Sequence, residues 1–553
     1  MNHNIGQTLP AAAEKYPERT GLICKKGRRY HSWTFREMNS TADWFAHRLT
    51  NLGVKRGDRV MLMVKPSVEF ITLTFALFKI GAVIILIDPG MGYKNLLRCI
   101  GQVKPAVFIG IARAHFFKLV FPGPFKSLSI SVCIGPSFGL FGPALSAEQA
   151  ERSSSYGTTF PTAEVQADDL AAILFTTGST GPPKGVCYHH AIFTAQLELI
   201  RDYYRIGPDD IDQPAFPLFA LFSTGLGACS VIPTMNPAKP AQLDPAEFIA
   251  TINENRVTYT FGSPAIWNVV SSYCLDHKIK LNSVKKVLMA GAPVSGELLA
   301  RTRSILSDAA EIHTPYGATE SLPVASISAK EILAETWEET RKGKGVCVGQ
   351  PLPSMVIKII RVSDLPIQIW DDSLVLPDYE IGEIAVKGPV VTLQYDNNDR
   401  ENQLAKIAAD NKLWHRMGDL GYLDAKGRLW FCGRKAHRVM TETGTMYTVC
   451  CEALFNEHPE VFRSALVGVG LPGKQIPVLI VELHDKKRET GRLLEELRQI
   501  AQHNEMTGPI EHFLVHSDFP VDIRHNAKIF REKLAVWAEE KLSKQTSYNQ
   551  DQG

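Results

Sequence analysis

Short, continuous runs of apolar residues recur along the first third of the chain. They occupy residues 60–64, 82–87, 106–109 and 171–175, and patterns with a helical period, such as residues 35–52, lie between several of them. Strands that are apolar throughout are buried on both faces, and their alternation with helices is typical of parallel sheets covered by helices. The pattern therefore predicts an α/β fold with parallel-type sheets.

One apolar stretch raises the question of a membrane span. Residues 70–87, FITLTFALFKIGAVIILI, approach the length needed to cross a bilayer, but Lys79 lies within them and Gly81 interrupts them. We interpret the stretch as a buried helix that ends near Gly81, followed by a short buried strand. We therefore predict no transmembrane segment and leave peripheral contact with a membrane open.

The pattern changes in the second half of the chain. Around residues 382–388 the strands become shorter and more alternating, which predicts an antiparallel, barrel-like portion. After Gly433 and Arg434 the pattern starts again, with two strands and three helices that predict a small α+β domain. Residues 121–161 are rich in Pro, Gly and Ser, which predicts a loop.

These patterns give a domain organisation. We expect a large N-terminal domain at residues 1–432, built from two parallel-type α/β subdomains and the smaller barrel-like portion. A small, mobile α+β domain follows at residues 433–545, and a polar, disordered tail at residues 546–553.

Composition excludes several classes of protein. The 553 residues include 60 Lys and Arg against 58 Asp and Glu, so the formal charge is only +2 and a dedicated nucleic-acid-binding protein is not expected. Ten cysteines in a chain of this length, without the spacing of zinc ligands, are typical of a reduced, intracellular protein. The first residues lack the pattern of a signal peptide, so we expect a cytoplasmic location.

Candidate chemistry begins with a loop at residues 174–186, LFTTGSTGPPKGV. A buried strand runs into a segment dense in glycine and hydroxyl side chains with a single lysine, Lys184. Glycines allow backbone N–H groups to approach an anion, hydroxyls add donors and lysine adds positive charge. A Gly/Ser linker is the alternative, but the ordered pattern after a strand favours a phosphate-binding loop. The loop does not match the Walker A pattern.

This loop resembles the phosphate loop of the adenylate-forming superfamily, which includes acyl-CoA synthetases, luciferases and peptide-synthetase adenylation domains. The resemblance extends over nearly the whole chain, because further family motifs follow in order. They are Gly291-Ala292-Pro293, the YGATE segment that begins at Tyr316 and Gly317, the GDLG segment with Asp419, Gly433-Arg434, and Lys528 in the segment NAKI. The resemblance implies an ATP-dependent ligase that couples a carboxylate to AMP and releases pyrophosphate.

The resemblance also implies a role for each motif residue. The β- and γ-phosphates would bind Thr176, Thr177, Gly178, Ser179, Thr180, Gly181 and Lys184, and adenine would lie against Gly291, Ala292, Pro293, Tyr316 and Gly317. Thr319 would contact the α-phosphate, Glu320 would hold Mg²⁺, Asp419 would accept the ribose hydroxyls and Arg434 would contact ribose or phosphate. Lys528 would bring positive charge to the reacting carboxylate and α-phosphate. His190, just after the loop, is as well explained by a capping or core role as by catalysis.

Three departures concern the second half-reaction. Ala220 stands where many acyl-CoA ligases carry histidine, Ala436 stands at the usual polar hinge position, and His437 replaces an acidic residue. These features, with the segments WHRMGD at 414–419, GRKAHRV at 433–439 and PYGATESLP at 315–323, resemble the β-lactone synthetases of bacterial long-chain olefin biosynthesis.

That branch implies a specific reaction. The substrate would be a long-chain 2-alkyl-3-hydroxy acid, whose own 3-hydroxyl attacks the acyl-adenylate to close a β-lactone and expel AMP. A lactone-decarboxylating enzyme of the hydrolase type would be a neighbour in the pathway. The base that assists the hydroxyl is not identified by the sequence. The alternatives are an ordinary long-chain acyl-CoA or acyl-AMP ligase and, from another class, a non-catalytic nucleotide- or lipid-binding protein.

The alkyl chains need an apolar pocket. We expect it between residues 216–225, residues 260–267 and residues 291–293, although an ordinary core role is the better explanation for each aromatic or leucine side chain there taken singly.

Overall fold

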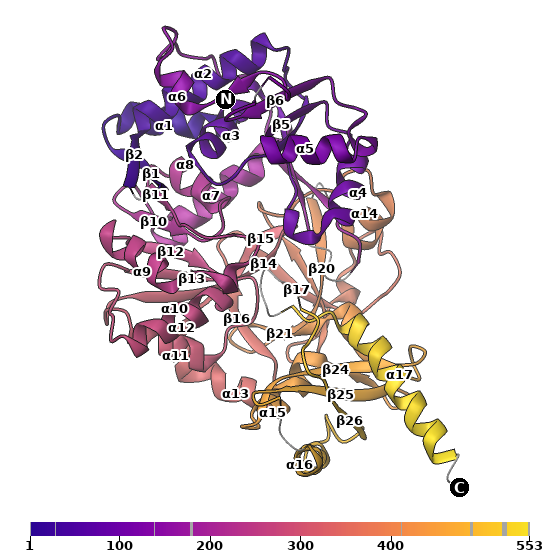
Figure 1. Ribbon diagram of the computed structural model, residues 1–553. Coiled ribbons are helices and arrows are strands. Elements are labelled where there is room, and N and C mark those ends of the chain that lie inside the picture. Colours follow the sequence, from indigo (N-terminus) through magenta and orange to yellow (C-terminus); the bar gives the residue numbers. More distant parts are fainter. Residues whose placement is uncertain are drawn as a thin grey trace.

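The computed structural model describes residues 2–27, 29–137, 139–176, 181–410, 412–486, 490–521 and 528–550. Within them the strands form a 7-stranded, a 14-stranded and a 3-stranded sheet and one 2-stranded ribbon. Residues 20–34 first contribute two strands to one end of the 14-stranded sheet, and the chain then forms the 7-stranded sheet. It returns to the 14-stranded sheet and finishes with the 3-stranded sheet and the extended helix at the C-terminus (Figure 1).

The 7-stranded sheet is parallel except for its last strand, β9, which pairs antiparallel with β8. Its order is β7 (Ala144–Leu145), β6 (Ile130–Ile134), β5 (Val107–Ile111), β3 (Arg59–Met63), β4 (Val83–Leu86), β8 (Leu170–Phe175) and β9 (Gly185–His189). The loop predicted over residues 121–161 is therefore wrong in part, because β6, β7 and α6 (Ala147–Glu151) lie within it. Pro and Gly between these short elements hid their pattern.

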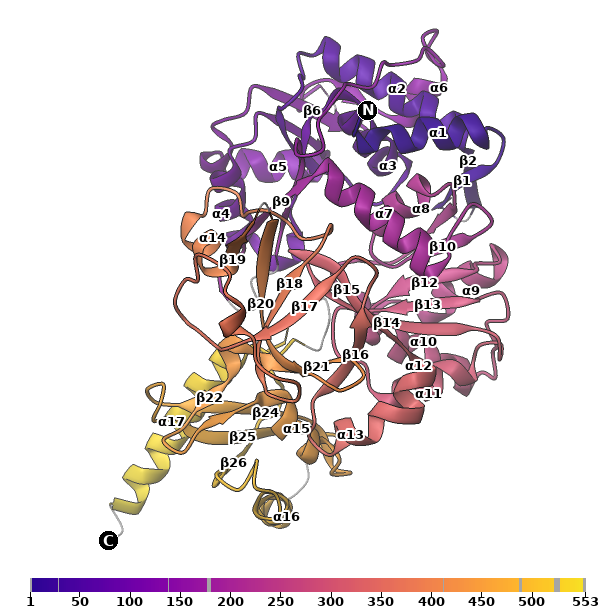
Figure 2. The ribbon, with the colours of Figure 1, turned by 180° about the vertical axis from the view of Figure 1, so that it is seen from behind.

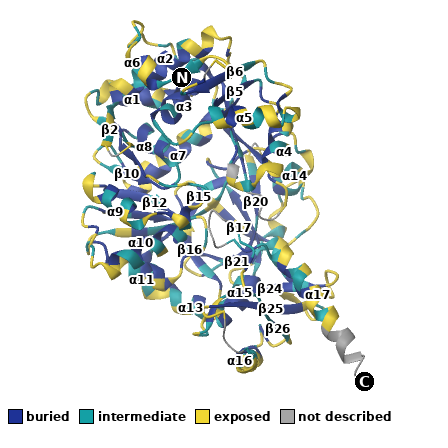
Figure 3. Cartoon of the chain, viewed as in Figure 1, coloured by how far each residue is buried: buried dark blue, intermediate teal, exposed yellow. Residues whose placement is uncertain are grey.

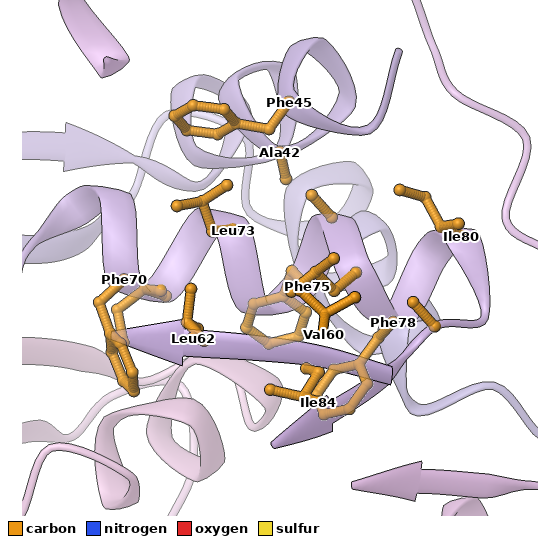
Figure 4. Close-up of a cluster of buried hydrophobic side chains, with 14 of the residues drawn as sticks. Ala42, Phe45, Val60, Leu62, Phe70, Leu73, Phe75, Phe78, Ile80 and Ile84 are labelled. Carbon is orange, nitrogen blue, oxygen red and sulfur yellow. The ribbon is translucent and has the colours of Figure 1, made fainter. Parts of the chain in front are cut away.

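Alternate residues of these strands enter two different cores. Val60 and Leu62 of β3 pack with α2 (Phe35–Asn51) and α3 (Val68–Ile80), as Figure 4 shows for the side chains around Phe75. Met61, between them, packs on the opposite face with α4 (Tyr93–Val103). Helices thus cover both faces, which explains why the strands are apolar throughout.

The 14-stranded sheet begins with a mostly parallel part. It contains β2 (Arg29–Thr34), β1 (Thr20–Lys26), β11 (Cys229–Ile232), β10 (Ile211–Pro214), β12 (Tyr259–Gly262), β13 (Lys286–Met289) and β14 (Glu311–Ala318). One face packs against α9 (Pro245–Glu254), α10 (Pro264–Asp276) and α11 (Gly296–Ser304). On the other face lie α7 (His190–Tyr204) and α8 (Phe219–Gly225). Figure 3 shows the strands buried between these helices.

The same sheet continues as an antiparallel part. It contains β15 (Ser321–Ser328), β16 (Val346–Pro351), β21 (Leu429–Arg434), β20 (Lys412–Leu423), β18 (Gly382–Lys387), β17 (Val356–Ile360) and β19 (Lys406–Ala409). Figure 2 shows β17, β18 and β20 side by side. The antiparallel pairing agrees with the prediction, but no pairing among the described residues closes these strands into a barrel. Alternating strands suit an open sheet as well as a barrel.

The remaining helices connect or cover these sheets. They are α1 (Thr8–Lys15), α5 (Ala112–Val120), α12 (Ala329–Glu331), α13 (Trp337–Arg341) and α14 (Asp399–Ala405).

The last sheet contains β24 (Val461–Val469), β25 (Ile476–Leu483) and β26 (His512–Val515), preceded by the ribbon of β22 (Val439–Met440) and β23 (Thr445–Met446). It packs with α15 (Thr448–Asn456) and α16 (Gly491–Gln502) on one face and α17 (Arg531–Gln550) on the other. Helix α17 extends through Gln550, so residues 546–550 of the expected disordered tail are helical. Their polar residues lack the apolar period on which the prediction relied, but none of them is a helix breaker. The boundary between residues 432 and 433 stays a prediction.

The apolar stretch at residues 70–87 is a buried helix and strand, as predicted. Helix α3 begins after the Ser67 cap and ends at Gly81, whose φ of 78° requires the left-handed conformation that glycine adopts without strain. Lys79 is fully buried, and its ammonium donates to Asp43 Oδ1 at 2.5 Å and to Asn39 Oδ1 at 2.7 Å on α2. None of the described helices has the length and apolar character to cross a membrane.

The Lys79–Asp43 pair gives a test of this packing. Replacing Lys79 by Met leaves the Asp43 carboxylate buried without its counter-ion, which costs about 3–5 kcal/mol of unfolding free energy. Replacing both residues, Lys79→Met with Asp43→Leu, removes the uncompensated charge and restores most of the loss. Urea unfolding followed by fluorescence measures both variants. A single variant within about 1 kcal/mol of the wild type would contradict this assignment.

Candidate active site

A large cavity lies where the last part of the chain meets the antiparallel part of the 14-stranded sheet. Its volume is about 1480 Å³. Predicted site residues from every motif line it, namely Thr176, Gly181, Lys184, Gly291, Ala292, Pro293, Tyr316, Gly317, Thr319, Glu320, Asp419, Arg434 and Lys528. Thr177, Gly178, Ser179 and Thr180 lie outside the described residues. The fold thus gathers motifs that are far apart in sequence around one space.

The base of the phosphate loop is closed by its own backbone. The Thr176 N–H donates to the Lys184 carbonyl at 3.0 Å, and the Lys184 N–H donates to Thr176 Oγ1 at 3.1 Å. These bonds continue the β8–β9 ladder to the foot of the loop. The Lys184 ammonium forms an ion pair with Glu401 of α14 and lies 5.2 Å from the centre of the Tyr395 ring. A cation is therefore held at the mouth of the loop, where phosphate charge is expected.

Asp419 is the centre of a second group. It lies opposite Arg434 in the β20–β21 ladder, and its Oδ1 is 2.8 Å from Arg434 Nη1. The Tyr316 hydroxyl, from β14, donates to Asp419 Oδ2 at 2.6 Å. Burial raises the pKa of the Asp419 carboxyl, whereas the Arg434 guanidinium lowers it. Three strands thus hold one carboxylate in a fixed orientation on the cavity wall.

Glu320 lies in the two-residue turn between β14 and β15. Its Oε1 accepts a hydrogen bond from the Tyr395 hydroxyl at 2.8 Å, and its backbone carbonyl accepts from the Thr392 N–H and hydroxyl, both at 2.9 Å. The preceding carbonyl, of Thr319, accepts from the Tyr188 hydroxyl at 2.6 Å. Both predicted residues are therefore fixed through their backbone carbonyls, and Glu320 is fixed through its side chain as well.

This arrangement fits Mg²⁺ in one specific way. No cluster of three His, Cys, Asp or Glu ligands occurs among the described residues, and within that part of the chain no hydrogen bond involves Glu320 Oε2. Mg²⁺ is commonly held by one or two carboxylates, substrate phosphates and water rather than by a cage of protein ligands. A single carboxylate oxygen beside the expected phosphates matches that chemistry.

Two residues near Glu320 carry no recognisable sequence signal. Lys406 of β19 donates to the Thr392 carbonyl, and burial lowers the pKa of its ammonium to about 7 although the Glu320 carboxylate opposes the shift. Tyr395 orients Glu320, as described above. Neither residue lies in a recognisable motif, and only the fold brings the two side chains beside Glu320; of the two, Tyr395 lines the cavity.

Lys528 reaches the cavity from the last part of the chain. Its charge lowers the pKa of Asp419, so the two side chains lie in the same electrostatic environment. Three residues later, Arg531 donates to Glu452 Oε2 at 2.7 Å and to its Oε1 at 2.9 Å. Glu452 Oε1 also accepts from the Leu466 N–H at 2.8 Å. This buried ion pair anchors the chain just beyond Lys528 to α15 and β24.

The other end of the cavity is apolar. Phe219 of α8 stacks on Phe261 of β12, with ring centres 3.8 Å apart, and Phe216, Phe222 and Leu288 line the cavity near them. This agrees with the pocket expected near residues 216–225 and 260–267. Trp267, in contrast, is fully buried in the core formed with α9 and α11, so the core interpretation holds for that residue.

Two further sequence positions have structural roles. Ala220 is fully buried in the core beside α1 and α3. His190 Nδ1 accepts a hydrogen bond from the Ile5 N–H at 3.2 Å, its ring packs against Phe78, and burial lowers its pKa to about 4. Of the two roles considered for His190, the structure supports the core role.

Known proteins resemble this chain over nearly its full length. "Olefin beta-lactone synthetase" of Stenotrophomonas maltophilia is 43% identical, covering 98% of this chain and 99% of that relative. The protein of the same name from Xanthomonas campestris pv. campestris is also 43% identical, covering 97% of each chain. Among solved structures, O-succinylbenzoate–coenzyme A synthetase from Bacillus subtilis in complex with ATP and magnesium has a TM-score of 0.73 at 21% identity, covering 95% and 98% of the two chains.

The sequence profile of the AMP-binding enzyme family matches residues 9–396, from α1 to the segment that contains Tyr395. This match covers both the phosphate loop and the segment with Glu320, and it confirms the resemblance drawn from the motifs. The chain belongs to the AMP-binding enzyme family and is an ATP-dependent adenylate-forming enzyme.

Proposed function

We propose that the protein activates a long-chain 2-alkyl-3-hydroxy acid as its acyl-adenylate and then closes it to a β-lactone with release of AMP. The observation that carries the proposal is the 43% identity, over nearly the whole of both chains, to two relatives named olefin β-lactone synthetase. The cavity supports it, because one continuous space joins a charged end to an aromatic, apolar end. An acid with long alkyl chains needs the charged end for its carboxylate and the apolar end for its chains.

The first half-reaction brings two anions together. Residues 176–181 and Lys184 bind the β- and γ-phosphates, Thr319 contacts the α-phosphate, and Gly291, Ala292, Pro293, Tyr316 and Gly317 lie against adenine. Asp419 accepts the ribose hydroxyls, and Arg434 contacts ribose or phosphate. Glu320 would hold Mg²⁺, which would supply charge neutralisation for the phosphates. The ammonium of Lys528 lowers the repulsion between the carboxylate and the α-phosphorus.

The second half-reaction needs no second substrate. The 3-hydroxyl and the activated carbonyl belong to one molecule, so their effective concentration is set by geometry and not by diffusion. The hydroxyl oxygen bonds to the carbonyl carbon, the bond from that carbon to the AMP oxygen breaks, and the hydroxyl proton leaves. The product is a strained lactone, and we propose that a decarboxylase of the hydrolase type consumes it in the cytoplasm.

A CoA ligase is the second candidate. It is favoured by relatives named 2-succinylbenzoate–CoA ligase, which are 25–26% identical over 76–85% of this chain. Against it stand Ala220, buried in the core, and Ala436, which lines the cavity without a polar group at the hinge position. The β-lactone reaction accounts for both departures.

The assigned roles predict distinct defects. Asp419→Ala removes the proposed ribose acceptor and weakens ATP binding, measured by calorimetry, at least about 10-fold.

Lys528→Ala leaves ATP binding within about threefold but lowers acid-dependent pyrophosphate–ATP exchange about 100-fold, because the charge of the lysine acts on the reacting groups. Asp276→Ala and Lys412→Ala, at exposed positions outside the cavity, serve as matched controls. Wild-type exchange in both site variants would refute the assignment.

The reaction class is tested by omitting CoA. Purified protein is incubated with ATP, Mg²⁺ and a 2-alkyl-3-hydroxy acid, with and without CoA, and products are followed by mass spectrometry and NMR. We expect AMP and lactone in equal amounts at the same rate in both mixtures. Thioester formation that requires CoA, with no lactone in either mixture, would establish the CoA ligase instead.

A further inference from the structure

His437 lies in the cavity wall at the point where β21 ends. It closes a short 3-10 helix, Lys435–His437, that follows Arg434, and it lines the same cavity as Asp419 and Lys528. The imidazole is half-buried, and its Nδ1 is fully shielded from solvent. Among the residues that the structure describes, no hydrogen bond or ion pair involves this ring. A titratable side chain at the cavity wall thus has no hydrogen-bonding or ionic partner within the described part of the chain.

The other ionisable groups of this region are already engaged. The described pairs are Asp419 with Arg434 and Tyr316, Glu383 with Arg416 and Lys435, Glu452 with Arg531, Glu320 with Tyr395, and His458 with Glu496. His484 also lines the cavity, but it is exposed and its ring packs edge-on against the half-exposed Phe462. His437 is therefore the group best suited to accept a proton inside the cavity.

We propose that His437 is the general base of the second half-reaction and takes the proton of the substrate 3-hydroxyl as that oxygen attacks the adenylate carbonyl. This rests on the proposed β-lactone synthesis. The hydroxyl oxygen forms the bond to the carbonyl carbon, the carbon–oxygen bond to AMP breaks with its electron pair on AMP, and the proton moves to an imidazole nitrogen. The imidazolium then releases this proton to solvent.

The electrostatics of the site are consistent with a neutral imidazole. Burial and the positive charges of Arg531 and Arg434 lower the pKa of His437 to about 3, so that the ring is unprotonated at neutral pH. The charged side chains of Lys435, Lys528, Asp419 and Glu452 line the same cavity. A bound adenylate adds a phosphate anion beside Arg434 and raises the proton affinity of the ring, which a general base requires.

The test separates the two half-reactions in the full-length protein. His437→Ala and His437→Asn are compared with the wild type and with His484→Ala. Pyrophosphate–ATP exchange with a 2-alkyl-3-hydroxy acid reports adenylation, and lactone formation reports closure. We expect exchange within about twofold of wild type in all variants and lactone formation lowered about 100-fold in both His437 variants only. Added imidazole should restore part of the lost lactone formation in His437→Ala.

Each other outcome has a distinct meaning. Lactone formation at the wild-type rate in either His437 variant overturns the role of the base. Equal losses of exchange and lactone formation, without rescue by imidazole, also overturn it, because the residue would then act in adenylation or folding. If the wild-type protein forms no lactone at all, the proposed function fails, and this inference fails with it.

Discussion

The ion pair between Asp419 and Arg434 fixes the geometry on which the rest of the site depends. It joins β20 to β21 at the last residue of the 14-stranded sheet, directly before the chain enters the ribbon and the 3-stranded sheet. Tyr316 ties the same carboxylate to β14. A buried ion pair of this kind loses much of its Coulomb energy to desolvation, so its value lies in positioning more than in stability. The placement of His437, three residues after Arg434, follows from it, and so does the orientation that we propose for the nucleotide.

A second constraint is the balance of charge around the cavity. ATP, the carboxylate and pyrophosphate are anions, and the site must stabilise them without leaving unpaired cations buried in their absence. The structure meets this requirement by pairing its cations with carboxylates, as Lys184 with Glu401 and Arg531 with Glu452. Lys406 avoids the cost of a buried cation in another way, since burial lowers its pKa to about 7 and makes the neutral amine accessible. These ion pairs compensate the cations before the nucleotide binds, and phosphate oxygens can then replace the protein carboxylates as partners of the cations.

Most of the architecture could be predicted from the sequence, because strands that are buried on both faces appear as continuous apolar runs. The period in residues 35–52 and the glycine at 81 gave α2 and the end of α3 correctly. The loop prediction for residues 121–161 failed because β6, β7 and α6 are too short to show a period. The barrel-like character expected near residues 382–388 could not be settled from the sequence, because closure of a barrel depends on long-range strand pairing. In the site, ordered motifs pointed to Asp419, Glu320 and Lys528, which the fold brings to one cavity, and their roles stay predictions. Tyr395 and Lys406 could not be predicted, because a single Tyr or Lys outside any motif has no pattern and only the fold sets it beside Glu320.

The central claim is that a carboxylate oxygen attacks the α-phosphorus and that the 3-hydroxyl oxygen then closes the ring. Isotopic labelling of the substrate carboxylate with ¹⁸O tests both steps at once by mass spectrometry of AMP and of the lactone. The account predicts one labelled oxygen in the phosphate of AMP and one in the lactone, at the carbonyl. AMP without label, or a lactone that retains both carboxylate oxygens, would contradict it, because the hydroxyl would then have been the group activated and displaced.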